Sequence, residues 1–153
     1  MNSFDTLLSL AGEWEGRNRV QPDPTTNINE SSSHLRITPM LRDTFVRIDQ
    51  TWSWKDDPQS GSMLIGHNPK TGQATMHWVD TWHNGRNVMP LSGKFDEQGR
   101  LVLHGHFAVA SSPDWGWRIE IFTRDDRLNI DMFCINPKSA KEEGWVWGSF
   151  GRI

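Results

Sequence analysis

Apolar and polar side chains alternate along most of this chain with a period of two residues. The alternation is clearest where Trp117, Ile119 and Ile121 alternate with Arg118 and Glu120. The same period occurs in four further segments, 42–54, 75–83, 127–135 and 145–150. Because side chains of a β-strand switch faces at every residue, each segment predicts a strand.

Turn-forming sequences separate these segments at short intervals. They include Asn84-Gly85, the strongest type of two-residue hairpin signal, and the turn sequence at residues 96–99. Strands of usual length between the turns number about ten, with no room for crossover helices. An antiparallel sheet of this size hides its edges by closing. We therefore predict an all-β fold, a closed antiparallel up-and-down β-barrel in a single domain over residues 1–153, with a two-sheet sandwich as the alternative.

The first residues have a different pattern, which predicts a short amphipathic helix over residues 3–10. Ser3 suits the N-cap, Asp5 suits the positive end of the helix dipole, and Gly12 can end the helix. We expect this helix to cap one end of the barrel.

The chain contains nine tryptophans and no tyrosine, and the tryptophans follow the strand period. Trp78 and Trp82 lie four residues apart, and six others form Trp-x-Trp pairs. The pairs are Trp52/Trp54, Trp115/Trp117 and Trp145/Trp147. Charged side chains occupy the opposite faces of most of these strands, so the tryptophan faces are expected to point inward.

This assignment also places polar side chains inside the barrel, namely Asp80, Gln50 and Ser149. Buried polar groups need partners, so these groups either bond to one another or line a cavity that receives a ligand. An aromatic wall with a few polar groups is typical of a small-molecule site. We predict a site for a small hydrophobic or aromatic ligand, oriented by Asp80, Gln50 and Ser149. Its predicted wall consists of Trp52, Trp54, Trp78, Trp82, Trp117 and Trp147.

Composition limits the partners and the compartment. The net charge is −3 with a pI of about 6.0, which argues against binding to nucleic acid or to an anionic membrane. The single cysteine, Cys134, excludes an internal disulfide and fits a reducing compartment. The first residues lack a secretory signal, and no apolar run has the length of a membrane span. We expect a cytoplasmic protein, and the sequence leaves open whether it forms a homodimer.

Two segments resemble known families. Gly12, Trp14 and Gly16, in L-A-G-E-W-E-G, resemble the G-x-W opening of the calycins, the superfamily of lipocalins, fatty-acid-binding proteins and avidins. That resemblance implies that Trp14 closes one barrel end and stacks on Arg152. The segment 66–81, with the L-S-G-K-F-D-E-Q-G-R-L that follows it, resembles a bacterial family of lipocalin-like domains, domain of unknown function 1579.

The resemblance implies a closed barrel with an interior cavity, and it implies no particular substrate because that family has no settled activity. The chain departs from the family pattern at His67 and Asn68, where the family has an aromatic residue and an aspartate before the proline. Ligand contacts from that turn therefore cannot be carried over.

Candidate chemistry is sparse. His104 and His106 share one strand face, but that face is expected to point to solvent and no carboxylate follows nearby, so no metal site is predicted. Haem is not expected either, because the related nitrobindins bind it through a histidine on a late strand and no histidine follows His106.

Two other functions stay open beside small-molecule binding. Asp80, between Trp78 and Trp82, is the best candidate for a general acid or base if the protein is an enzyme. No partner base or nucleophile is evident, and Cys134 is expected to be an inert buried thiol. The third possibility is a barrel with a filled core that associates with another protein.

Overall fold

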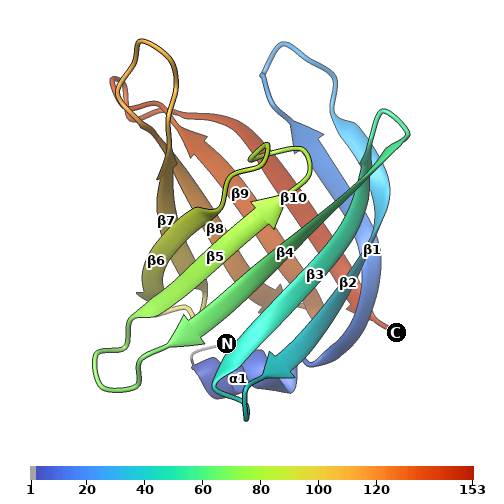
Figure 1. The fold of residues 1–153 in the computed structure, drawn as a ribbon. Coiled ribbons are helices and arrows are strands. Elements are labelled where there is room, and N and C mark those ends of the chain that lie inside the picture. Colours follow the sequence, from blue (N-terminus) through green and yellow to red (C-terminus); the bar gives the residue numbers. More distant parts are fainter. Residues whose placement is uncertain (1–2) are drawn as a thin grey trace.

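The computed structural model describes residues 3–153 and shows a closed barrel of antiparallel strands with one short helix at its lower end (Figure 1). In chain order the elements are α1 (Phe4–Ser9), β1 (Gly12–Gln21), β2 (Asn29–Met40), β3 (Phe45–Trp54), β4 (Asp57–His67), β5 (Ala74–Asp80), β6 (Met89–Phe95), β7 (Leu101–Phe107), β8 (Trp115–Arg124), β9 (Arg127–Ile135) and β10 (Glu142–Arg152).

Every strand pairs with its neighbour in the sequence, and β1 closes the barrel by pairing with β10. The closing register places Trp14 opposite Arg152 and Gly16 opposite Phe150. A Cβ on Gly16 would overlap the carbonyl oxygen of Ser149, so the close approach of the two strands requires glycine at this position. The predicted closed barrel is confirmed, and the two-sheet alternative is excluded.

The lower end of the barrel is closed by α1 and Trp14. Ser3 caps the helix as predicted, since its hydroxyl oxygen accepts a hydrogen bond from the Thr6 amide at 3.4 Å. The Trp14 indole donates to the Leu10 carbonyl at 2.9 Å, and the Arg152 guanidinium lies 4.5 Å from the centre of the Trp14 ring. The expected stacking of Trp14 on Arg152 is therefore confirmed.

Above α1 the barrel is filled by packed side chains. The inward faces of β3, β5, β8 and β9 are those that the alternation predicted. Their buried members include Val46, Ile48, Met76, Ile119, Ile121, Leu128 and Ile130, none more than 2% exposed. This part of the interior is a solid apolar core.

Trp147 and Ser149, on β10, were predicted to point into the barrel. This prediction is wrong, because both lie on the outer face of the strand. Val146 and Phe150 are the buried positions of this strand, 4% and 0% exposed. The Trp147 ring packs against that of Trp145, with ring centres 5.1 Å apart. The strand has apolar residues on both faces and no charge after Glu143 until Arg152, so the alternation could not distinguish inside from outside.

The Asn84-Gly85 pair does not form a two-residue hairpin. β5 ends at Asp80 and β6 begins at Met89, so residues 81–88 form a longer loop at the upper end of the barrel (Figure 1). Two-residue turns with positive φ occur instead at Lys55-Asp56 and Asp125-Asp126. The loop 81–88 is the element that shapes the site described next.

No helix among residues 3–153 has the length and apolar character needed to cross a membrane.

Candidate functional site

Two cavities adjoin at the upper end of the barrel, opposite α1. The larger, about 410 Å³, is lined by Trp78, His83, Asn84, Asn87, Val88, Met89, His106, Phe107, Ala108 and Trp117. The smaller, about 290 Å³, is lined by Val20, Pro22, Trp82, His83, Trp117, Cys134, Glu143, Gly144, Trp145 and Val146. His83 and Trp117 belong to both linings, so these two side chains separate the cavities.

The His83 side chain lies inside the barrel and is surrounded by indole rings. Its ring centre lies 4.7 Å from that of Trp82, 5.3 Å from Trp78, 5.4 Å from Trp52 and 5.7 Å from Trp117. Burial lowers the pKa of His83 to about 4, although the Asp80 carboxylate opposes this shift. The imidazole is therefore neutral at pH 7, and within residues 3–153 neither of its nitrogens has a hydrogen-bond partner.

In the predicted strand over residues 75–83 the face of Trp78 and Trp82 points inward, which would place His83 on the outer face. The structure shows that this expectation is wrong. The strand period ends at Asp80, and the chain then turns inward. The Asp80 carboxylate causes the turn: one oxygen accepts hydrogen bonds from the amides of Trp82 at 2.7 Å and His83 at 2.8 Å. The other oxygen accepts from the Trp52 indole at 3.3 Å. Asp80 is thus buried as predicted, and it fixes the start of the loop 81–88.

The predicted tryptophans divide into two groups. Trp78, Trp82 and Trp117 line the cavities directly. Trp52 and Trp54 lie behind Trp82, with ring centres 5.6 Å and 4.7 Å from it. The structure thus brings together five of the six predicted wall residues and excludes Trp147.

The Trp117 indole N–H is unsatisfied. Its Nε1 is buried and has no hydrogen-bond acceptor among the described residues. Trp145, at the edge of the smaller cavity, also has a buried Nε1, and this atom likewise has no acceptor within residues 3–153. A buried donor without a partner has a cost of about 1–3 kcal/mol, and most such groups in proteins are paired. The geometry at Trp117 suits a ligand that provides an acceptor.

Gln50 lies inside the barrel, as predicted, but it does not line either cavity. Its side-chain amide donates to the Asn18 oxygen at 3.3 Å and to the Ser33 hydroxyl oxygen at 3.1 Å. Ser33 in turn donates to the Thr51 carbonyl at 2.7 Å. Of the two fates considered for the inward polar groups, mutual hydrogen bonding applies to Gln50. Asn18 and Ser33 were not among the predicted site residues, although both occupy inward positions in the alternation of their strands.

Cys134 lines the smaller cavity. Burial, with a further contribution from the Glu143 carboxylate, raises the pKa of its thiol to about 11. The thiol is therefore protonated at neutral pH, which is unsuitable for a nucleophile.

His104 and His106 lie on the outer face of β7, and both are exposed, as predicted. Among residues 3–153 no group of three or more His, Cys, Asp or Glu side chains is arranged to hold a metal ion.

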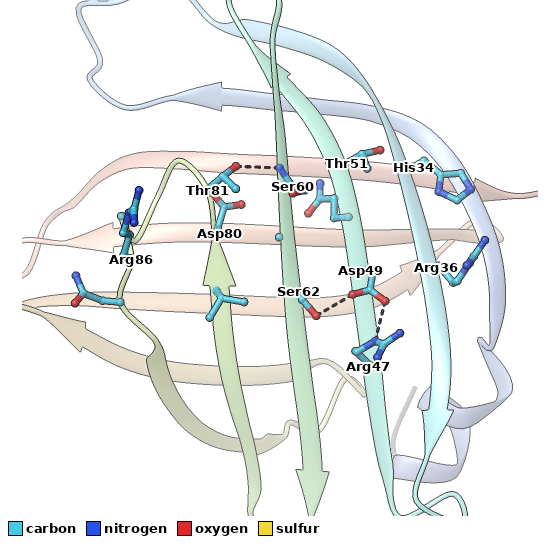
Figure 2. Close-up of a pocket in the computed structure, with 15 residues that line it drawn as sticks. His34, Arg36, Arg47, Asp49, Thr51, Ser60, Ser62, Asp80, Thr81 and Arg86 are labelled. Atoms are coloured by element: carbon cyan, nitrogen blue, oxygen red, sulfur yellow. Dashed lines mark hydrogen bonds and ion pairs between the residues drawn. The ribbon is translucent and has the colours of Figure 1, made fainter.

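A wide groove of about 770 Å³ lies over β2, β3, β4 and β5 and is bordered by the loop 81–88 (Figure 2). Its lining also includes Gln50 and Asp80. Figure 2 shows Arg47 and Ser62 on either side of Asp49, whose carboxylate accepts from them at 2.8 Å and 2.9 Å. Arg36, at the edge of the groove, pairs with Glu13 at 2.6 Å. Because this groove is open to solvent and most of its charges are already paired, it suits a small apolar ligand less well than the cavities inside.

Asp131, on the outer face of β9, has an unusual carboxyl group. Burial raises its pKa to about 6, and the neighbouring Glu120 carboxylate adds to the shift. The unfolded chain releases this proton at lower pH than the folded protein, so the charged carboxylate reduces stability as the pH rises through about 6.

Asp131→Asn is expected to raise the melting temperature at pH 7 and to have little effect at pH 4, where Asp131 is protonated in the folded protein. Thermal unfolding at both pH values measures this, with Asp114→Asn on an exposed loop as the control. An equal gain for both variants would contradict the assignment.

Comparisons with known proteins identify the fold and assign no activity. The model of a family described as "Protein of unknown function (DUF1579)" matches residues 2–152. A comparison with curated proteins found no match. Among solved structures, the chain is similar to the crystal structure of Rv2717c from M. tuberculosis, with a TM-score of 0.70 and 13% sequence identity, over 98% of this chain and 96% of that one. At this identity the likeness concerns the fold alone.

Proposed function

The chain belongs to the DUF1579 family, which is described as having unknown function, and we propose from the site alone that it binds a small apolar or aromatic molecule at the upper end of its barrel. The observation that carries this proposal is the buried Trp117 N–H, which lies without an acceptor where the two cavities meet. An apolar ligand with one acceptor atom would fill the space and satisfy this donor.

The lining of the cavities supports this ligand class. The two side chains between the cavities, His83 and Trp117, are both aromatic. Polar atoms in the larger cavity belong to neutral groups such as Asn84 and Asn87. Among the described residues that line the two cavities, Glu143 in the smaller one is the single carboxylate. A strongly charged ligand would therefore lose its hydration with little compensation. The Trp82 and Trp78 rings provide the flat apolar surface that an aromatic ligand needs.

The site differs from the one predicted from the sequence in its polar members. Asp80 and Gln50 have hydrogen bonds within the protein, so we assign them to holding the wall in place. Ser149 and Trp147 lie outside the barrel and are not part of the proposed site. Trp117 takes the orienting role that was expected of Asp80, Gln50 and Ser149.

We propose further that the barrel is lipocalin-like and belongs with the calycins. The Trp14 ring under the Arg152 guanidinium, at one closed end of an up-and-down barrel, supports this assignment. A cytoplasmic location stays a prediction. The expected absences of haem, metal and nucleic-acid partners are also predictions.

Catalysis by Asp80 remains the alternative hypothesis. Its carboxylate already accepts three hydrogen bonds, from Trp52, Trp82 and His83, and these bonds favour a structural task. No observation at the site favours catalysis over binding.

The test is intrinsic tryptophan fluorescence of the full chain during titration with lipids, flavins, haem and aromatic metabolites. A true ligand is expected to give a saturable change, because several indoles contact the cavities. Trp117→Phe keeps an aromatic side chain, smaller than the indole, and removes the N–H. It should weaken binding of that ligand about tenfold, which corresponds to roughly one hydrogen bond.

Trp147→Phe is the matched control, since it makes the same substitution on the outer face. It should leave the affinity unchanged. The proposal fails if no compound changes the fluorescence, or if Trp147→Phe weakens binding as much as Trp117→Phe does.

A further inference from the structure

The loop 81–88 places a flat nitrogen heterocycle, the His83 imidazole, in the centre of the proposed site. Four indole rings surround it at centre-to-centre distances between 4.7 Å and 5.7 Å. The rings approach it from different directions: Trp52 is nearly parallel to the imidazole, at 30°, whereas Trp82 meets it edge-on at 87°. These are the arrangements in which aromatic rings attract one another.

The ring is held by its surroundings and not by hydrogen bonds of its own. Asp80 fixes the backbone of His83, and Asn84 donates a side-chain hydrogen bond to the Trp78 carbonyl at 3.3 Å. In contrast, the later residues of the loop, from Gly85 to Val88, are exposed, and Val88 is 56% exposed. The loop is therefore attached through His83 and Asn84 and is exposed from Gly85 to Val88, so an outward rotation of the His83 side chain is opposed mainly by its contacts with the four indole rings.

Removal of the imidazole from this position would join the two cavities. His83 lines both, and the only other residue that does so is Trp117. The four indole rings that now surround the imidazole, those of Trp52, Trp78, Trp82 and Trp117, form an aromatic cage. The joined space would have this cage as its wall and the unsatisfied N–H of Trp117 at its side. In the present arrangement the tethered imidazole lies beside Trp117 without accepting its hydrogen bond.

We infer that His83 occupies the position of the ligand, and that the ligand is a neutral planar nitrogen heterocycle whose acceptor atom bonds to the Trp117 N–H. Binding displaces the His83 side chain outward, so His83 and the ligand compete for the same cage. The inference rests on the proposed function, because it names the ligand class and the gating residue of that site.

Each part of the ligand description has its own support. A planar shape follows from the ring now in the cage. An acceptor follows from the Trp117 donor. Neutrality follows from the surroundings, because the Asp80 carboxylate is already bonded to the protein and burial disfavours a charged imidazole at this position.

The test is to remove the His83 side chain and return it as a free molecule. His83→Ala in the full chain should bind 4-methylimidazole at pH 9, where the ring is neutral. The expected dissociation constant is about 1 mM, as suits so small a ligand. Tryptophan fluorescence and calorimetry measure it. His77→Ala, on the outer face of β5, is the matched control and should bind nothing.

Three comparisons define the chemistry. Toluene has a similar shape without an acceptor and should bind His83→Ala about tenfold more weakly than 4-methylimidazole. That preference should disappear when Trp117→Phe is added. Tetramethylammonium tests the opposite possibility, since aromatic cages also attract cations; tighter binding of this ion would overturn the neutral ligand class.

Failure of this inference can be told apart from failure of the proposed function. If His83→Ala is folded but does not bind 4-methylimidazole, His83 does not occupy the ligand position. A ligand of the wild-type protein whose binding is weakened by Trp117→Phe would still uphold the binding function. If the alanine variant does not fold, His83→Ser provides the same space, and the same outcomes apply to it.

Discussion

Asp80→Ala is expected to lower the free energy of unfolding by about 3 kcal/mol, because it removes an acceptor on which three donors depend. The amides of Trp82 and His83 and the indole of Trp52 would all lose their partner at a site where Asp80 is only 9% exposed. The loop 81–88 should then open, since these bonds attach its first residues to β5. Urea unfolding measures the stability, and hydrogen exchange of the Trp82 and His83 amides measures the opening.

Asp80→Asn separates hydrogen bonding from charge. The amide oxygen can still accept from the two loop amides, so we expect a smaller loss, roughly half that of the alanine variant. Asp114→Ala, on an exposed loop, should change stability by no more than about 0.5 kcal/mol. If Asp80→Asn proves more stable than the wild type, the carboxylate is a costly buried charge kept for another purpose, and catalysis regains support.

The barrel was predictable because charges label one face of most strands. In β8, Arg118 and Glu120 mark the outer face, so the alternation places Trp117, Ile119 and Ile121 inside. The last strand has no such label between Trp145 and Phe150. Large apolar residues lie on both of its faces there, and the inward positions turned out to be those of Val146, Gly148 and Phe150.

The site was predictable as far as its strands extend. Trp78 and Asp80 follow the period of β5 and are buried as expected. His83 lies three residues beyond the end of that strand, where alternation no longer applies and hydrogen bonds to the Asp80 carboxylate decide the direction of the chain. The Asn84-Gly85 pair indicated a tight hairpin, whereas the chain uses Asn84 to bond the Trp78 carbonyl. An aspartate followed within three residues by two aromatic rings is a local signal that could have suggested a loop folded inward.

The polar groups inside the barrel were also predicted only in part. Gln50 was placed correctly, but its partners, Asn18 and Ser33, lie on β1 and β2, far from it in the sequence. Only the register of the three strands brings them together. From the sequence one can predict that an inward glutamine needs hydrogen-bond partners. Which residues provide them depends on the register of the closed barrel.

Acidification from pH 7 to pH 5 is expected to destabilise the wild-type protein by about 2 kcal/mol through His83 alone. In the folded protein the pKa of His83 is lowered to about 4, and in the unfolded chain it returns to about 6.5. The unfolded state therefore binds a proton as the pH falls below about 6.5, whereas the folded state does not until about 4. At pH 5 this difference favours unfolding by about 30-fold, and the loss is complete below about pH 4.

His83→Phe isolates this effect, because phenylalanine fills the cage with a ring that does not titrate. The other titratable groups near His83 are common to both proteins: Asp80 from β5, which bonds the His83 amide, and the cavity-lining residues Glu143 from β10, Cys134 from β9 and His106 from β7. The difference between the urea unfolding curves of the two proteins at pH 7 and pH 5 therefore reports His83. The wild type should lose about 2 kcal/mol more than the variant over this interval. An equal loss of stability in both proteins would mean that the imidazole is protonated in its buried position or lies mostly outside the cage.

The preference for protonation in water also acts on any opening that exposes His83, because the open loop, like the unfolded chain, returns the imidazole to water. If the ring leaves the cage to admit a ligand, acid must favour that departure.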